Sequence, residues 1–459
     1  MSIGARALTG EAYMGHVFWD TEIYLLPFYT YTWPAAARAM LMYRYHTLPA
    51  AREKAAELGY RGALYAWESA DDGEEATPAY VTMPDGAVVT IKNGTQEQHI
   101  SADIAYAVWQ YWQATGDEVF LREAGAEIIL ETARFWASRA QLEADGRYHI
   151  RQVIGPDEYH DSVDDNAYTN VLAQWNIDQA LDIARHLETN SPERWAELSK
   201  QLKLEASELD DWRAVARGIE TGLDPESGLI EQFEGFFKLD PIFISGYTMR
   251  TAPMDVLLGA ERTKRSQIAK QADVVMLLQL LWDRFSPQAR EANFRFYEAR
   301  TGHGSSLSPV THAVVAARLG DVGLAAQYFH QAAAIDFDDT MRNAALGIHI
   351  GSQGGLWQVA VLGFAGLQLR ADGLRFDPHL PPAWKSLRFS AHWHGSRVRC
   401  AINAEPRTFT ATLESGDPFT VSMGNVEHTL ETGKTWTCEW DETAHQWVDA
   451  AAQLVSRVG

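Results

Sequence analysis

The spacing of apolar residues changes once along this chain of 459 residues, at about residue 366. Before that point apolar residues recur three and four positions apart, which is the period of amphipathic helices. Beyond it, short alternating runs are separated by Pro, Gly, Asn and Asp, a pattern typical of antiparallel strands. The sequence therefore predicts a mainly α protein, with a helical domain at 1–366 and a small antiparallel β domain at 367–459. Helices are expected at about residues 34–45, 101–116, 118–140, 166–189, 266–283, 307–319 and 321–335.

Many helices joined by short turns are compatible with three architectures, an all-α toroid, a long bundle or a solenoid. The chain has no clear repeat of fixed period, which disfavours a solenoid. Chemically reactive side chains gather in the longer connections, and this suits a toroid whose loops meet at one mouth. Within the second predicted helix, Ser101 is expected to be the N-cap and Gly116 to end the helix.

Charge and composition argue against several classes of function. There are 39 Lys and Arg against 61 Asp and Glu, a net charge of −22, whereas nucleic acids and anionic membranes require a basic face. The chain lacks a phosphate-binding Gly-Lys loop, a dinucleotide fingerprint and histidines at ligand spacing, so neither a nucleotide cofactor nor a metal is expected. Only Cys400 and Cys438 are present and the start does not resemble a secretory signal, so the cytoplasm is the expected compartment.

Two carboxylates follow a Gly-Pro turn in the segment 153–160, shortly before a predicted helix. Glu158 is a candidate general acid, because the oxygen of a glycosidic bond must be protonated as it departs. Such a role requires surroundings that keep a carboxyl protonated. The alternative is structural, with Asp157 or Asp164 capping a helix and Glu158 solvated.

Aromatic residues stand next to carboxylates at two places, Trp19-Asp20 and Trp67-Glu68, in a chain that has 16 Trp beside 17 Tyr and 18 Phe. An indole ring can stack on the face of a sugar while a carboxylate accepts hydrogen bonds from two of its hydroxyls. The pattern predicts a carbohydrate site. A core Trp beside a capping Asp explains each pair equally well.

Small residues dominate the segment 301–308, where backbone N–H groups and the hydroxyls of Ser305 and Ser306 could bind an oxyanion such as phosphate. A Gly-rich turn before the helix at 307–319 is the alternative. Lys270 and Gln271 are expected on the helix that begins near Ser266, as a surface pair.

These segments together resemble glycoside hydrolase family 65, which contains inverting phosphorylases for maltose, trehalose, kojibiose and nigerose. The resemblance runs in order from about residue 8 to 366 and continues into the β region. It rests on the motifs GEAYMGHVFWDTEIYLLPFY, MLMYRYHTLPAAREKA, WESADDGEE, VIGPDEYHDSVDDNAYTN, KQADVV, HGSSLSP and GIHIGSQGGLWQ.

The resemblance implies an (α/α)6 barrel followed by a small β-sandwich-like domain, and it implies roles for single residues. Glu158 matches the proton donor of the family. The residues that match the glucose site are Trp19, Asp20, Lys270 and Gln271. The residues that match the phosphate pocket are Ser305, Ser306 and His349. Further substrate contacts are expected at the mouth from Trp67, Glu68 and His99.

The implied reaction is inverting phosphorolysis, in which an α-glucosyl disaccharide and phosphate give β-glucose 1-phosphate and an acceptor sugar. Phosphate is the co-substrate, and neither a metal nor an organic cofactor is implied. Two alternatives stay open: an inverting α-glucosidase or trehalase of the same family that uses water, and an inactive sugar-binding fragment. A homodimer is the candidate assembly.

The chain departs from the family pattern in two ways. The first motif begins by residue 10, so the N-terminal β-sandwich and helical linker of the family are expected to be missing, together with the first barrel helix. Asp165 stands where the family motif has Asn. An additional carboxylate close to Glu158 would favour the protonated form of that residue.

Overall fold

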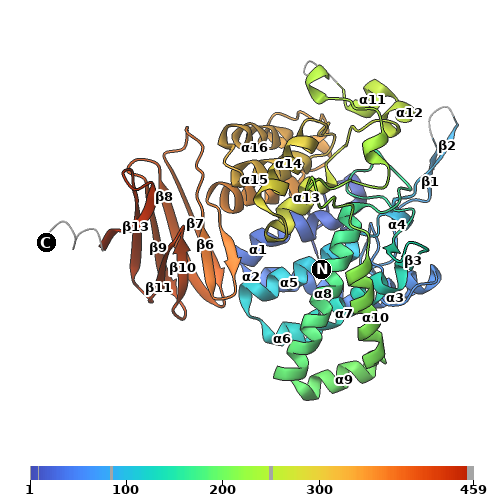
Figure 1. Ribbon diagram of the computed structural model, residues 1–459, viewed down its shortest axis with the longest axis horizontal. Helices are drawn as coiled ribbons and strands as arrows, with labels where there is room; N and C mark the ends of the chain where they lie inside the picture. Colours follow the sequence, from blue (N-terminus) through green and yellow to red (C-terminus); the bar gives the residue numbers. More distant parts are fainter. Residues whose placement is uncertain (1, 9, 83–85, 248–251, 452–459) are drawn as a thin grey trace.

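The computed structural model describes residues 2–8, 10–82, 86–247 and 252–451. Figure 1 shows a helical barrel beside a separate sheet domain, which is reached only at the end of the chain. Within the described residues, no helix is long and apolar enough to cross a membrane.

Six buried helical segments form the inner ring of the barrel. Each contacts the next in chain order, and α17 returns to contact η2, so the ring closes. Most of their side chains belong to one continuous apolar core. The inner segments are η2 (Thr21–Leu25) with α1 (Leu26–Thr32), α5 (Ile100–Thr115), α8 (Ala167–Asn190), α13 (Asp273–Leu280), α15 (Ser308–Arg318), and α17 (Ile350–Gln358) with η8 (Val359–Phe364).

The outer helices are α2 (Pro34–His46), α7 (Ala126–Arg139), α10 (Ala206–Gly218), α14 (Pro287–Glu298) and α16 (Val322–Phe337). Four of the outer helices pack over the junction between two neighbouring inner helices, whereas α10 contacts the inner α8 and the outer α7. The described residues contain no outer helix over the junction between α17 and η2. The predicted (α/α)6 barrel is therefore confirmed, with an inner ring of six segments and five outer helices in the described part of the chain.

Two predictions about helix ends are wrong. Ser101 does not cap α5, because His99 occupies the N-cap position and Ser101 Oγ instead accepts a hydrogen bond from Tyr65 N at 3.0 Å. The helix expected at 266–283 begins only at Asp273. Residues 266–272 are not helical, because their backbone makes isolated bridges and hydrogen bonds to 240 and 300–304 instead of helical hydrogen bonds. Gly116 does end α5, in the left-handed conformation.

Shorter elements fill the connections. The short helices are η1 (Ala12–Gly15), α3 (Leu48–Glu57), α4 (Asn93–Gln96), α6 (Glu118–Phe120), η3 (Leu121–Gly125), α9 (Pro192–Leu202), η4 (Phe236–Lys238), η5 (Ile244–Tyr247), α11 (Met254–Leu258), α12 (Ala260–Lys264), η6 (Trp282–Arg284) and η7 (Ala344–Leu346). Two hairpins pair β1 (Tyr80–Thr82) with β2 (Val88–Thr90) and β3 (Gln141–Leu142) with β4 (Tyr148–His149).

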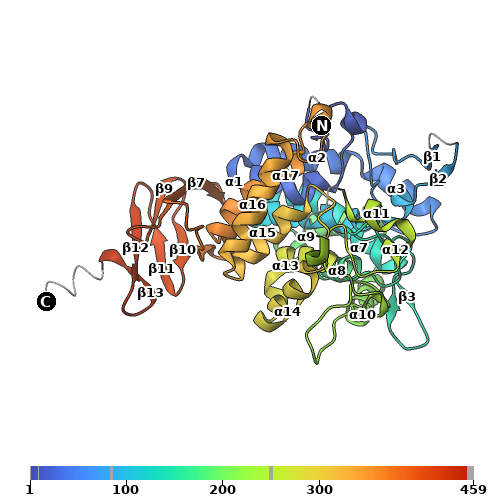
Figure 2. The same ribbon diagram turned by 90° about the horizontal axis from the view of Figure 1, so that it is seen from above.

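The C-terminal domain is a sandwich of two sheets around its own apolar core (Figure 2). One sheet has the order β11-β10-β6-β5 and the other β13-β12-β9-β8-β7. All pairs are antiparallel except β6 with β10, which run parallel. The strands are β5 (Gln368–Arg370), β6 (Gly373–Phe376), β7 (Ser386–Trp393), β8 (Ser396–Asn403), β9 (Thr408–Ser415), β10 (Phe419–Met423), β11 (Val426–Leu430), β12 (Thr435–Asp441) and β13 (Gln446–Asp449).

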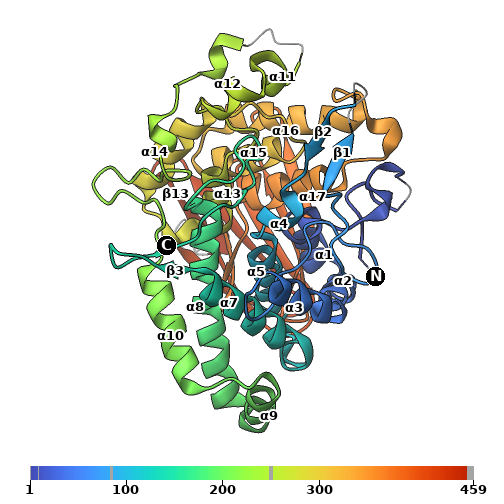
Figure 3. The same cartoon turned by 90° about the vertical axis from the view of Figure 1, so that its right-hand side faces the viewer.

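The two ends of the barrel differ in their connections. Long segments, including the β1–β2 hairpin, α4, α11 and α12, gather at the end that faces away from the β domain (Figures 1 and 3). The N-terminal ends of the inner helices lie at this end. The opposite end has shorter turns and contacts the β domain through β7, which packs on α1 and α5.

Candidate active site

One cavity at the open end of the barrel is lined by the predicted site residues other than His99. Its volume is about 610 Å³, which is within the range of small-molecule sites. The predicted residues in its lining are Trp19, Asp20, Trp67, Glu68, Glu158, Lys270, Gln271, Ser305, Ser306 and His349. They come from six separate stretches of chain, so the barrel brings together motifs that are far apart in sequence.

The segment that carries Glu158 is anchored through its neighbour Asp157. The buried Asp157 carboxylate accepts hydrogen bonds from the backbone N–H of Lys270 at 2.7 Å and from His160 Nδ1 at 2.7 Å. Asp157 therefore does not cap a helix, and the N-cap of α8 is Asn166. The segment also approaches Asp273 so closely that a Cβ on Gly155 would lie 2.2 Å from the carboxylate of Asp273. Glycine is required there because of this contact.

Glu158 and Lys270 form an ion pair in the cavity, with 2.8 Å between Glu158 Oε1 and Lys270 Nζ. Lys270 lies in the extended segment before α13, not on a helical surface. Burial lowers the pKa of Lys270, but the nearby acidic groups, with Glu158 foremost and Glu97 next, together outweigh burial, so the pKa is raised and Lys270 stays charged. Gln271 is fixed beside it, because its Nε2 donates to the carbonyl of Pro156 at 2.7 Å.

Two indole rings form an aromatic wall of the cavity. The rings of Trp19 and Trp67 lie 6.3 Å apart with a tilt of 33°. His99 packs edge-on behind both, at 5.1 Å from Trp19 and 5.4 Å from Trp67, and is fully buried. Its Nδ1 is 2.7 Å from Asp103 Oδ2. The structure therefore differs from the expected mouth contact, because His99 supports the two indoles and does not line the cavity.

The carboxylates beside the aromatic wall are partly shielded from water. Burial raises the pKa of Asp20 to about 7, so this carboxyl changes its charge near neutral pH. Burial likewise raises the pKa of Glu68, although the contact with His16, 2.8 Å between Glu68 Oε1 and His16 Nδ1, opposes this effect. Both side chains can accept hydrogen bonds from sugar hydroxyls.

The predicted phosphate loop is held against the segment that carries Lys270. Gly302 N donates to the carbonyl of Ala269 at 2.7 Å, and Gly304 N donates to that of Lys270 at 3.1 Å. A Cβ on Gly304 would lie 2.7 Å from the Tyr159 hydroxyl, so the close approach depends on glycine. This pairing places Ser305 and Ser306 in the cavity lining, directly before α15.

Arg6 is a cation of the cavity lining that no sequence motif indicated. Its side chain is buried, donates to the carbonyl of Gly347 at 2.8 Å and lies 3.3 Å from His349 Nδ1. The same His349 nitrogen lies 2.7 Å from Asp336 Oδ1, which favours the tautomer with the proton on Nδ1 and leaves Nε2 available. No local pattern identifies Arg6, because it meets His349 only through a contact between residues 343 positions apart.

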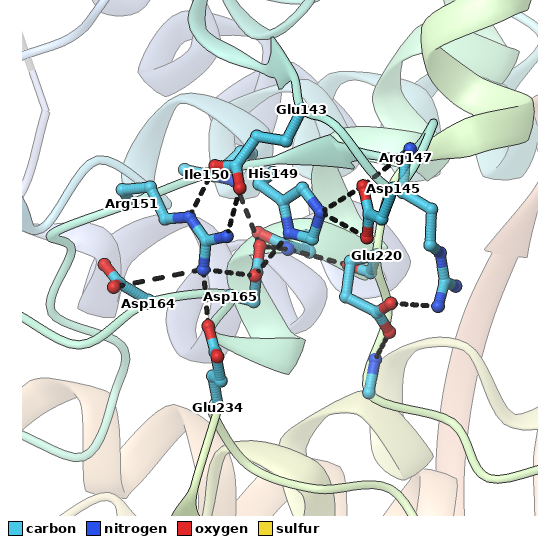
Figure 4. Close-up of polar contacts among 12 residues, drawn as sticks. Glu143, Asp145, Arg147, His149, Ile150, Arg151, Asp164, Asp165, Glu220 and Glu234 are labelled. Atoms are coloured by element: carbon cyan, nitrogen blue, oxygen red, sulfur yellow. Dashed lines mark hydrogen bonds and ion pairs between the residues drawn. The ribbon is translucent and has the colours of Figure 1, made fainter.

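The Asp165 carboxylate lies in a charged cluster on another side of the loop (Figure 4). It is 2.7 Å from His149 Nδ1 and 2.9 Å from Arg151 Nη1, and Arg151 also pairs with Glu143 and Glu234. Asp165 is therefore engaged by these cations. The Asp165 carboxylate makes its polar contacts with His149, Ile150, Arg151 and Asn170. These contacts give no support to the expectation that the charge of Asp165 favours the protonated form of Glu158.

The described residues contain no group of His, Cys, Asp or Glu side chains arranged to hold a metal ion. The structure is thus an (α/α)6 barrel whose mouth combines indole rings, carboxylates and a loop of small residues, a combination suited to binding carbohydrate. Comparison with family models identifies the family: the chain belongs to glycosyl hydrolase family 65. The model of its central catalytic domain matches residues 1–358, and that of its C-terminal domain matches residues 367–430.

Individual relatives agree with this assignment. The chain is 45% identical over 405 residues to the kojibiose phosphorylase of Halothermothrix orenii, covering 88% of this chain and 52% of the relative. It is 37% identical over 435 residues to the α,α-trehalose phosphorylase of Thermoanaerobacter brockii, covering 94% and 54%. A solved structure from the human microbiome, provisionally assigned as a kojibiose phosphorylase, matches with a TM-score of 0.85 at 29% identity and covers 95% of this chain and 62% of its own. The chain thus spans about half the length of the curated relatives it matches.

Proposed function

We propose that the chain carries the catalytic site for inverting phosphorolysis of an α-glucosyl disaccharide. Glu158 must act in its protonated form, not in the ionised form that is paired with Lys270 in the structure. It then protonates the departing glycosidic oxygen while phosphate attacks C1 from the opposite face of the sugar, giving β-glucose 1-phosphate and an acceptor sugar. The proton comes from a side chain and the nucleophile is already an anion, so the step requires no cofactor. Trp19, Asp20, Lys270 and Gln271 hold the glucosyl unit in this proposal.

The set formed by Arg6, Ser305, Ser306 and His349 is the observation that carries the proposal. These residues line the same cavity as Glu158. Arg6 and the two serines offer a guanidinium and two hydroxyls as donors to an oxyanion, and His349 Nε2, which is unprotonated when the ring proton is on Nδ1, can accept from the O–H of hydrogen phosphate. An inverting hydrolase requires instead a carboxylate base that activates water. The carboxylates in the described lining are Asp20, Glu68 and Glu158, none of which comes from the segments 304–307 or 341–349.

Phosphate dependence tests the proposal directly. Incubated with disaccharide, the chain is expected to release the acceptor sugar only when phosphate is present, and to form one β-glucose 1-phosphate for each acceptor. Release of glucose at an equal rate without phosphate would support the hydrolase instead. Disaccharide binding without turnover at any phosphate concentration would support an inactive sugar-binding protein.

Kojibiose is the first disaccharide to test, because a relative at 45% identity is a kojibiose phosphorylase, and trehalose is the second. In the reverse direction, β-glucose 1-phosphate offered with a panel of acceptor sugars identifies the linkage from the product.

Compartment and assembly stay predictions. Cys400 and Cys438 are both free and buried, which supports the expected cytoplasmic compartment. The candidate homodimer is tested by measuring the mass of the chain in solution across a dilution series.

A further inference from the structure

A second cavity lies at the opposite end of the barrel, where the C-terminal halves of the inner helices meet the first strand of the β domain. Its volume is about 340 Å³. Five aromatic rings and four glutamine amides are part of its lining, and none of the predicted active-site residues is. Its indoles are Trp109 on α5, Trp175 on α8 and Trp282 in η6.

A buried hydrogen-bond acceptor in this lining has no partner. Gln358 Nε2 donates to the carbonyls of Ile23 and Tyr24, both at 2.8 Å, so Gln358 must present Oε1 to its other neighbour. That neighbour is Gln279, whose Nε2 donates to Gln358 Oε1 at 2.9 Å. The orientation of both amides is therefore determined, and Gln279 Oε1 is left buried without a donor within the described residues. Such an atom destabilises the folded state unless a bound molecule supplies a donor.

A half-buried cation, Arg318, provides donors in the same lining. Arg318 donates to the carbonyls of Gln279 at 3.0 Å and Leu362 at 3.4 Å, near the ends of two inner helices. Arg318 forms no ion pair among the described residues, although burial lowers its pKa and the charge of Asp283, in the same lining, opposes that effect. A guanidinium has five N–H groups, so further donors of Arg318 remain for a ligand after these two hydrogen bonds.

Aromatic rings supply flat apolar surface beside these polar groups. Trp109 is half-buried, and its ring stands nearly perpendicular to that of Trp175, 5.5 Å away at 87°. Aromatic faces next to amides are the combination that binds the apolar face and the hydroxyls of a pyranose. The inner helices point their C-terminal ends toward this cavity, and the partial negative charge of these ends disfavours an anionic ligand.

We infer that this cavity is a second binding site, for a neutral sugar of one or two pyranose rings. A sugar hydroxyl donates to Gln279 Oε1, Arg318 donates to a sugar oxygen, and Trp109 stacks on a ring face. The site binds without catalysing a reaction, because the carboxylate in its lining, Asp283, is ion-paired with Arg370 at 3.1 Å. Sugar binding in this cavity does not depend on the proposed phosphorolysis, because the linings of the two cavities have no residue in common.

Fluorine NMR on the chain labelled with 5-fluorotryptophan separates the two cavities in one titration. Single Trp→Phe variants assign the resonances of Trp109, Trp175, Trp19 and Trp67. Trp112 is the matched control, because it is also half-buried on α5 but donates through Nε1 to Glu118 at 2.9 Å, outside the cavity. Glucose and maltose are the probes.

The expected result is a saturable shift of the Trp109 and Trp175 resonances, with that of Trp112 unchanged. Trp109→Phe is expected to raise the dissociation constant read from Trp175 at least about threefold through loss of stacking area, whereas Trp112→Phe leaves it unchanged. Saturable shifts at Trp109 and Trp175 support the inference even when Trp19 and Trp67 do not respond, a result that would count against the active-site proposal alone. Shifts confined to Trp19 and Trp67, or shifts at Trp109 that never saturate, would overturn the inference.

Discussion

Two parts of the active cavity are built from opposite chemistry. The sugar part combines the indoles of Trp19 and Trp67 with carboxylates, among them Asp20 and Glu158. The anion part offers donors from Arg6 and from the segments 304–307 and 341–349, which add no carboxylate to the described lining. A carboxylate binds neutral hydroxyls well but repels phosphate. The two sets are adjacent, because the charge of Arg6 acts on Asp20, and this cation offsets the repulsion in the proposal that one cavity holds both substrates.

Removing the proton donor of the sugar part should have the largest effect. Glu158→Gln keeps the shape of the side chain but cannot deliver a proton, and general acid catalysis contributes about 10²–10⁴-fold. Turnover is expected to fall by that factor while the KM values for disaccharide and phosphate change little. Steady-state kinetics with both substrates varied checks this. Glu68→Gln, in the same cavity, is the control and should mainly raise the KM for disaccharide. Near-parental turnover by the Glu158 variant would assign the acid to another residue.

Weakening the anion part should change the KM for phosphate much more than the KM for disaccharide. The double substitution Ser305→Ala and Ser306→Ala removes two hydroxyl donors, and a hydrogen bond to a charged group is worth about 1.5–3 kcal/mol. The KM for phosphate is expected to rise at least about tenfold, with that for disaccharide nearly unchanged. Ser308→Ala is not a suitable control, because Ser308 Oγ contacts His303 Nδ1 at 2.9 Å. The exposed Ser227 on the barrel surface serves instead. An unchanged KM for phosphate would make this segment an ordinary turn.

Ionisation of Asp20, in the sugar part, should make the free energy of unfolding depend on pH. Burial raises the pKa of Asp20 from 3.8 to about 7, so between these values the folded state binds a proton that the unfolded state has released. The stability that this group contributes is therefore lost as the pH rises through that window. Compared with Asp20→Asn, the parent is expected to lose about 2 kcal/mol of unfolding free energy between pH 5 and about pH 6.5.

Urea unfolding of both proteins across that pH range measures the difference, with the exposed Asp210→Asn as the control. Parallel curves for parent and Asp20→Asn would show that Asp20 is ionised throughout the range. At neutral pH, loss of the carboxylate should also lower kcat and raise the KM for disaccharide, because its hydrogen bonds strengthen as charge develops on the ring.

A substitution outside both parts should have the smallest effect. Asp165→Asn loses ion pairs with His149 and Arg151, but Arg151 keeps Glu143 and Glu234. A loss of about 1–2 kcal/mol in unfolding free energy is expected, with kcat and both KM values unchanged. Asp164→Asn, 3.9 Å from Arg151 and more exposed, should cost less. A change in kcat without a change in stability would mean that this cluster acts on Glu158 after all.

Local sequence patterns predicted the main elements more reliably than their ends. The helical period before residue 366 and the alternation after it reflect burial of one face of a helix or strand, and the predicted fold class is confirmed. The prediction of a helix at 266–283 is wrong for its first turns, because hydrogen bonds from this backbone to 240 and 300–304 replace helical hydrogen bonds. The prediction that Ser101 caps a helix is wrong, because its hydroxyl instead accepts a hydrogen bond from the backbone N–H of Tyr65.

The sequence by itself determined the class of fold, the family, and the motifs that carry Glu158, Trp19 and Ser305. The fold class depends on short-range periodicity, and the motifs depend on contiguous residues. Only the tertiary structure decided which of these side chains meet. It brought Arg6 to His349 and Lys270 to Glu158, and placed His99 behind the indoles. It also created the second cavity around Gln279. Contacts of this kind join residues far apart in the chain, and their distances follow from closure of the ring, which no local pattern encodes.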